Sequence, residues 1–99
     1  MKIVAVTACP TGIAHTYMAA ERLERTAKKM GLDIKVETQG AMGIENELDQ
    51  GDIARADIVI FAADIALQKR ERFDGLKIVE VSVREAIKDP EGILKKLAG

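Results

Sequence analysis

The stretch that decides the fold is Ile3-Val4-Ala5-Val6-Thr7-Ala8, which runs directly into Cys9-Pro10-Thr11-Gly12. Its first six residues are apolar or β-branched with no polar alternation, which is typical of a strand buried on both faces of a parallel sheet. The next four residues break that pattern with a proline and a glycine. From Ile13 to Met30, apolar side chains recur every three or four residues, which predicts an amphipathic helix. The chain therefore begins with a strand, a turn and a helix.

Three further strands and several helical segments are predicted along the chain. Ile34–Thr38 alternates apolar and polar residues, which indicates a strand with one more polar face. Pro90 interrupts the helical pattern between Val83 and Leu97, because proline cannot sit in a helix interior without a break. The other predicted elements are strands at Ile58–Ala62 and Ile78–Val81, a short helix at Asp52–Ala56, and a polar loop or short helix at Leu67–Phe73.

Strands that alternate with helical segments predict an α/β protein of three layers, in which helices cover both faces of a four-stranded parallel sheet. The 99 residues are expected to form one domain. In open parallel sheets, ligands bind beyond the carboxyl ends of the strands. Cys9, Gly40 and Asp64 each follow a predicted strand, so a functional site is expected around them.

The composition argues against several classes of protein. The 15 basic and 16 acidic residues leave a net charge of -1, whereas nucleic-acid binders normally carry a basic excess. The longest apolar run, Ile58–Ala63, is far shorter than the roughly 20 residues of a membrane span. A single cysteine rules out an internal disulfide and a multi-cysteine metal site. We therefore expect a cytoplasmic protein that needs no metal and no cofactor.

Cys9 lies where a strand ends and a helix begins. The N–H groups at a helix start carry a partial positive charge, which favours a thiolate over a thiol and can cradle a phosphate. Gly12 lets successive N–H groups face inward, whereas Pro10 has no N–H to donate. Donors must come from Thr11 onward, and the hydroxyls of Thr11 and Thr16 can add to them. Simpler interpretations stay open, with Cys9 as a small buried hydrophobe and the threonines as helix caps.

Two other functions are open at this point. The spacing Cys9-x5-His15-Thr16 is similar to the phosphate loop of low-molecular-weight tyrosine phosphatases, in which an arginine clamps the phosphate at the place of His15. Asp89-Pro90 superficially matches the acid loop of those enzymes, but a helix cap followed by a first helical residue explains it better. A receiver-like module that binds Mg²⁺ is the other alternative, and it needs an acidic cluster that is missing after the first predicted strand.

The run Thr7-Ala8-Cys9-Pro10-Thr11-Gly12-Ile13-Ala14-His15-Thr16 closely resembles the phosphorylation loop of a known family. That family is the fructose-type IIB component of the bacterial phosphoenolpyruvate-dependent sugar phosphotransferase system. The resemblance spans almost the whole chain, and it departs from the family pattern at Leu67-Gln68, where an acidic residue is expected. It continues at Val36-Glu37-Thr38-Gln39-Gly40, Gly43-Ile44-Glu45-Asn46-Glu47, Ala62-Ala63-Asp64-Ile65 and Arg72-Phe73.

This resemblance implies a phosphoryl carrier. In such a carrier, Cys9 takes a phosphoryl group from the phosphohistidine of a IIA component and passes it to a sugar, fructose by family type, bound in the membrane component IIC. The resemblance also implies the strand order 2-1-3-4 and a cytoplasmic place at the inner membrane, reached through IIC without insertion of this chain. The residues that it assigns to the phosphate loop are Pro10, Thr11, Gly12, Ile13, Ala14, His15 and Thr16.

Other polar residues near the strand ends have a simpler interpretation. Glu37 and Gln39, at the end of the predicted second strand, are expected to form hydrogen bonds within loops, and Asp64 is expected to act as a loop cap. Several loops at the same edge contain apolar residues, which predicts a docking surface shared by the IIA and IIC components. These loops are Pro10–Ile13, Gly40–Ile44 and Asp64–Leu67.

Overall fold

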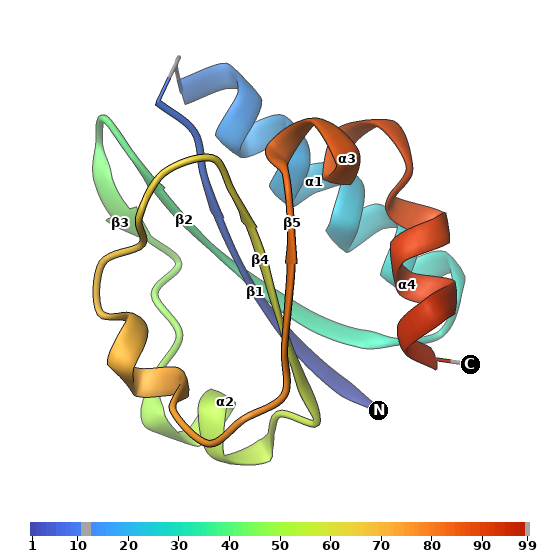
Figure 1. Ribbon diagram of the computed structural model, residues 1–99. Coiled ribbons are helices and arrows are strands. Elements are labelled where there is room, and N and C mark those ends of the chain that lie inside the picture. The colour runs from blue at the N-terminus through green and yellow to red at the C-terminus, as the bar shows by residue number, and fades with distance from the viewer. Residues whose placement is uncertain (11–12, 99) are drawn as a thin grey trace.

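A computed structural model describes residues 1–10 and 13–98 of the chain (Figure 1). Its strands are β1 (Lys2–Ala8), β2 (Asp33–Gly40), β3 (Gly43–Glu45), β4 (Ile58–Ala63) and β5 (Ile78–Val81). They form one sheet in the order β3-β2-β1-β4-β5. Neighbouring strands from β2 through β1 and β4 to β5 pair in parallel, in the order that the family resemblance implies.

The expected sheet of four strands, all parallel, is wrong in one respect. β3 pairs antiparallel with the end of β2 and adds a fifth strand at the edge, with Gly40 opposite Gly43. Gly43 has a φ of +87°, a left-handed conformation that glycine adopts without strain, so the chain can turn back sharply. Three residues are too few to show a periodic pattern, which is why the sequence does not reveal this strand.

Helices cover both faces of the sheet, as expected. Figure 1 shows helices on both sides of the sheet. On the first face lie α1 (Ile13–Lys29), α3 (Val83–Lys88) and α4 (Pro90–Ala98). On the second face lie α2 (Gln50–Arg55) and η1 (Arg70–Phe73).

The ends of two helices follow from their capping residues. Asp49 and Asp52 cap α2 reciprocally, since each side chain accepts a hydrogen bond from the backbone N–H of the other, and this starts the helix slightly earlier than predicted. The predicted break at Pro90 is confirmed, because α4 begins at that residue. Asp89 accepts a hydrogen bond from the N–H of Gly92 at 3.1 Å, which confirms its role as a cap.

The core lies on both faces of β1, because alternate side chains of a strand point to opposite sides. Ile3 and Ala5 pack with residues of α1, α3 and α4, whereas Val4 and Val6 pack with the group that contains Phe73 of η1. Every residue from Ile3 to Ala8 is buried, as predicted for a central parallel strand. With both faces packed, the edge of the sheet where the strands end is left for a functional site.

Candidate active site at the carboxyl edge of the sheet

Cys9 is the first residue after β1 and lies half-buried. Ala8, the last residue of β1, is paired with Gln39 of β2 on one side and with Ala63 of β4 on the other. The N–H of Asp64 donates to the carbonyl of Ala8 at 3.0 Å. The strand ends therefore converge around Cys9, as the sequence predicts, and the loops after β2 and β4 flank it.

Two hollows open beside Cys9. The first, here called the β2-side hollow, has a volume of about 290 Å³ and is lined by Cys9, Pro10, Gln39, Gly40, Ala41, Ile65, Ala66 and Gln68. The second, here called the α3-side cleft, has a volume of about 460 Å³ and is lined by Cys9, His15, Met18, Asp64, Val83, Arg84, Ile87 and Lys88. Cys9 therefore borders a hollow on each side.

Several residues of the expected phosphate loop are at the surface. Pro10 is exposed in the turn that follows Cys9. Ile13 begins α1, and Ala14 and His15 are exposed in the first turn of that helix. Thr11 and Gly12 lie outside the described residues. Phosphate binding by this loop stays a prediction, although its position next to Cys9 fits that role.

Thr16 is the buried member of the same group. It is 2% exposed, and its carbonyl accepts a hydrogen bond from the hydroxyl of Thr7 at 3.1 Å. It lines a small hollow with Thr38 and Met42, near the turn between β2 and β3, and does not line either hollow beside Cys9. Its contact with a phosphoryl group also stays a prediction.

A buried ion pair lies on the face of β2 that points toward η1. Glu37 is 0% exposed, and the two terminal nitrogens of Arg72 donate to its two carboxylate oxygens at 2.9 Å each. The N–H of Leu48 donates to the same carboxylate at 2.9 Å. The Nε of Arg72 donates to the carbonyl of Lys69 at 2.8 Å, and its guanidinium lies 4.8 Å from the ring centre of Phe73. These bonds tie β2, η1 and the segment before α2 together.

Gln39 extends this network to the neighbourhood of Cys9. Its amide nitrogen donates to Glu37 at 2.8 Å and to the carbonyl of Gln68 at 3.0 Å. Its amide oxygen accepts from the N–H of Gln68 at 2.8 Å. Gln39 and Gln68 both line the β2-side hollow, so the network fixes one wall of the site. Glu37 and Gln39 do form structural hydrogen bonds, but the expectation that these bonds lie within loops is wrong, because both residues belong to β2 and their partners include distant segments of the chain.

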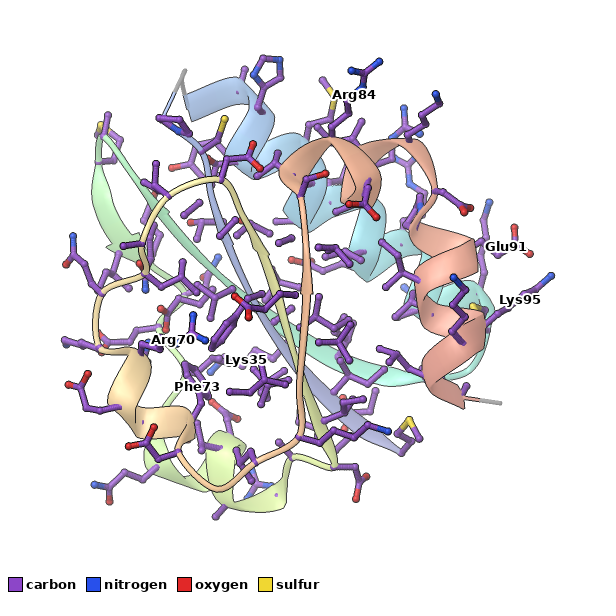
Figure 2. All side chains as sticks on the ribbon, in the orientation of Figure 1. Lys35, Arg70, Phe73, Arg84, Glu91 and Lys95 are labelled. Atoms are coloured by element: carbon purple, nitrogen blue, oxygen red, sulfur yellow. The ribbon has the colours of Figure 1, made fainter. Side chains whose placement is uncertain are left out.

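Two carboxylates on this side of the sheet, Glu37 of β2 and Asp52 of α2, are held in their charged form. A hydrogen bond from Lys35, 2.7 Å long, lowers the pKa of Asp52 to about 2. Burial alone would raise the pKa of Glu37, but the bonds from Arg72 and two further donors hold it below its ordinary value. The hydrogen bond to Glu37 raises the pKa of Arg72 in turn. Figure 2 labels Lys35 and Phe73 on this side of the sheet.

Asp64 acts as a cap between β4 and α3. Its carboxylate accepts a hydrogen bond from the N–H of Val83 at 3.3 Å, which confirms the expected structural role. Within residues 1–10 and 13–98, no group of three His, Cys, Asp or Glu side chains is arranged to hold a metal ion. None of the helices in the same ranges has the length and apolar character that a membrane crossing requires.

Sequence patterns assign no role to two arginines of this region. Arg72 is part of the resemblance, but nothing in its local sequence indicates that it pairs with Glu37, 35 positions earlier. Arg84 belongs to α3 and lines the α3-side cleft together with Cys9. Both positions depend on how distant segments pack, so no local pattern could have identified them.

A mainly parallel sheet with helices on both faces, and with a half-buried cysteine between two hollows at its carboxyl edge, defines an α/β protein with a candidate site at that edge. The chain belongs to the IIB family of the phosphotransferase system. The family model described as "PTS system, Lactose/Cellobiose specific IIB subunit" matches residues 4–96.

Individual relatives are similar over nearly the whole chain. The "PTS system fructose-like EIIB component 2" of Escherichia coli K12 is 54% identical and covers 97% of this chain and 91% of its own. A crystallised domain of the fructose-specific IIABC component of Borrelia burgdorferi has a TM-score of 0.90 at 50% identity, over 96% of this chain and 90% of that chain. An enzyme IIB subunit of Escherichia coli K12, solved in solution, has a TM-score of 0.92 at 43% identity, over 98% and 90%.

Proposed function

We propose that residues 1–99 form one phosphoryl-carrier domain of a fructose-type phosphotransferase system, and that Cys9 carries the phosphoryl group. The observation that carries the proposal is the position of Cys9, the single cysteine of the chain. It lies at the carboxyl edge of the sheet, just before α1, with a hollow on each side. Membership of the IIB family supplies the class of reaction, and the fructose-like relatives support the type of sugar.

The proposed chemistry is a pair of in-line phosphoryl transfers through one covalent intermediate. Cys9 first loses its proton to solvent, and its thiolate attacks the phosphorus of a phosphohistidine on the IIA component. An S–P bond forms as the N–P bond breaks, and the imidazole nitrogen keeps the electron pair. A sugar hydroxyl in the IIC component then attacks the same phosphorus and gives its proton to a base of that component. The S–P bond breaks, and the thiolate of Cys9 is restored.

Within this transfer, the assigned phosphate loop would stabilise the charge on the phosphoryl oxygens. Backbone N–H groups from Thr11 to His15 are the proposed donors, because they follow Cys9 at the start of a helix. His15 is proposed as an accessory residue and not as the acceptor, since a thiolate that is already ionised needs no base. The proposal includes no metal and no cofactor.

The proposed partners are a IIA donor and a IIC acceptor in the membrane, which places the protein at the cytoplasmic side of the inner membrane. The loops beside Cys9 carry exposed apolar side chains that suit transient docking. Met42, between β2 and β3, is 70% exposed, and Ile65, after β4, is 44% exposed. Ile44 and Leu67 of the expected surface are half-buried. Because Cys9 faces a single edge, both partners are expected to use overlapping parts of this surface.

The proposal is tested by incubation with a phosphorylated fructose-type IIA protein, followed by intact-protein mass spectrometry. The wild-type chain should gain one phosphoryl group, and Cys9→Ser should gain none that survives the measurement. Circular dichroism of Cys9→Ser provides the folding control, because a half-buried sulfur-to-oxygen change should leave the fold intact. Labelling of Cys9→Ser at the wild-type level would show that another residue is the acceptor and would end the proposal.

The phosphatase and receiver-like alternatives are less well supported. Two of the similar proteins from Escherichia coli K12 are IIB components that match over 91% and 90% of their own lengths, which favours the carrier. His15 also stands where the phosphatase loop places its arginine, so that clamp is missing from the loop itself. Release of phosphate from an aryl phosphate ester by the purified chain would revive the phosphatase.

A further inference from the structure

The α3-side cleft joins Cys9 to residues that lie far from it in the sequence. One wall comes from the first turns of α1, one from the end of β4, and one from α3. The side chain of Cys9 packs with the core beneath α1, α3 and α4, and therefore lies on the same face of the sheet as this cleft. A substituent on the sulfur is thus close to α3 as well as to the loop that begins α1.

Two cations of α3 border this cleft. Arg84 and Lys88 are one helical turn apart, so they lie on the same side of α3, and both are exposed. Figure 2 shows the side chain of Arg84 pointing outward from α3 at the edge where α1 begins. Among the described residues, neither cation forms an ion pair, whereas Arg72 is paired with Glu37.

The charges around the cleft favour an anion. Arg84 and Lys88 contribute two positive charges, and Asp64 contributes one negative charge that already accepts a hydrogen bond from the N–H of Val83. A phosphoryl group on Cys9 would add nearly two negative charges at the same place. Charge-assisted hydrogen bonds to phosphate are stronger than neutral ones, and arginine suits the geometry of phosphate particularly well.

We propose that Arg84, assisted by Lys88, binds the phosphoryl group carried by Cys9. This role rests on the proposed function of Cys9. In it, α3 supplies the positively charged side chain that the phosphate loop lacks. A phosphatase holds phosphate with an arginine fixed in its loop, whereas Arg84 reaches the site from an exposed helix. An exposed arginine would screen the oxygen charge without being fixed in the loop, which suits a carrier that must pass the group on.

An experiment that needs no partner protein measures the electrostatic potential at Cys9. Iodoacetate and iodoacetamide alkylate the same thiolate, but only iodoacetate is an anion, so the ratio of their rates cancels the thiolate fraction and reports the local potential. Loss of two positive charges beside this solvated cleft should lower the ratio of the iodoacetate rate to the iodoacetamide rate about fivefold in Arg84→Ala/Lys88→Ala at low salt, and less at high salt. The matched control is Arg22→Ala/Lys29→Ala, which removes two exposed cations of α1 that line neither hollow.

The second readout is phosphoryl transfer from phosphorylated IIA. Arg84→Ala should lower kcat about tenfold with a smaller change in KM, and Arg84→Lys should recover part of the loss, because a lysine keeps the charge without the paired donors. The control variant should transfer at the wild-type rate. A raised KM with unchanged kcat would make Arg84 a docking residue and overturn the inference.

The two proposals fail in different ways. If wild-type Cys9 is phosphorylated but the alkylation ratio of Arg84→Ala/Lys88→Ala equals that of the wild type, the inference about Arg84 is wrong and the proposed function stands. If wild-type Cys9 takes no phosphoryl group, the proposed function and the phosphate-binding role of Arg84 fail together.

Discussion

Arg72 and Arg84 lie on opposite faces of the same sheet (Figure 1), and they differ in what surrounds them. Arg72 donates to both oxygens of Glu37, which is fully buried, and its Nε is bonded to a backbone carbonyl. Arg84 is exposed beside the α3-side cleft and has no ion pair among the described residues. The chemistry of the two side chains is the same, so burial and partners decide their roles.

The comparison assigns a positioning role to Arg72 and agrees with the proposed ligand-binding role of Arg84. A buried carboxylate requires a partner, so Arg72 is held by Glu37 and its charge is cancelled. Through Gln39, this pair holds Gln68 and hence one wall of the hollow beside Cys9. The charge of Arg84 is not cancelled in this way and stays available to an anion at Cys9. The site thus has one wall held by hydrogen bonds and one wall with exposed cations.

Removal of Arg72 should cause the largest loss of stability. Arg72→Ala leaves the carboxylate of Glu37 buried without its partner, so the free energy of unfolding should fall by about 3–5 kcal/mol. Urea unfolding followed by circular dichroism measures this. The matched control is Arg70→Ala in the same short helix, whose ion pair with Glu80 is exposed and whose loss should cost about 1 kcal/mol or less. Equal losses in the two variants would contradict the structural role of Arg72.

Acidification should cause an intermediate loss of stability, through the carboxylates on the same face of the sheet as Arg72. Glu37 and Asp52 have pKa values below their ordinary ones in the folded chain, so the unfolded chain binds more protons as the pH falls. The stability that they contribute is present above their ordinary pKa values and should decline from about pH 5 downward. Urea unfolding at a series of pH values measures the slope. The slope below pH 4 should be shallower in Asp52→Asn, and an unchanged slope would contradict the assignment of Asp52.

Removal of the exposed arginine should have the smallest effect on stability. Arg84→Ala breaks no ion pair among the described residues, so the free energy of unfolding should change by less than about 0.5 kcal/mol. Its acid slope should match that of the wild type. A loss of several kcal/mol would mean that Arg84 stabilises the fold as Arg72 does, and the contrast between the two walls would disappear.

Much of the fold follows from local patterns in the sequence. The buried run Ile3–Ala8 predicts the central parallel strand, and the apolar stripe from Ile13 predicts α1, because burial repeats with the geometry of each element. Pro90 ends one helix and starts the next, since proline lacks the N–H that a helix interior requires. The junction at Cys9 is local too, so the sequence alone is enough to indicate the candidate nucleophile.

The remaining features depend on contacts between distant segments. β3 forms because Gly43–Glu45 pair with the edge of β2. This antiparallel pairing cannot be inferred from a sequence pattern of three residues. The alternation of β2 predicts a more polar face, but it does not show that Glu37 and Gln39 are buried there, because a partner from η1 or a loop replaces water. Strand register and helix packing bring Arg72 to Glu37 and Arg84 to the cleft of Cys9. Burial, partners and charge at a site are properties of that packing, so only the tertiary structure decides them.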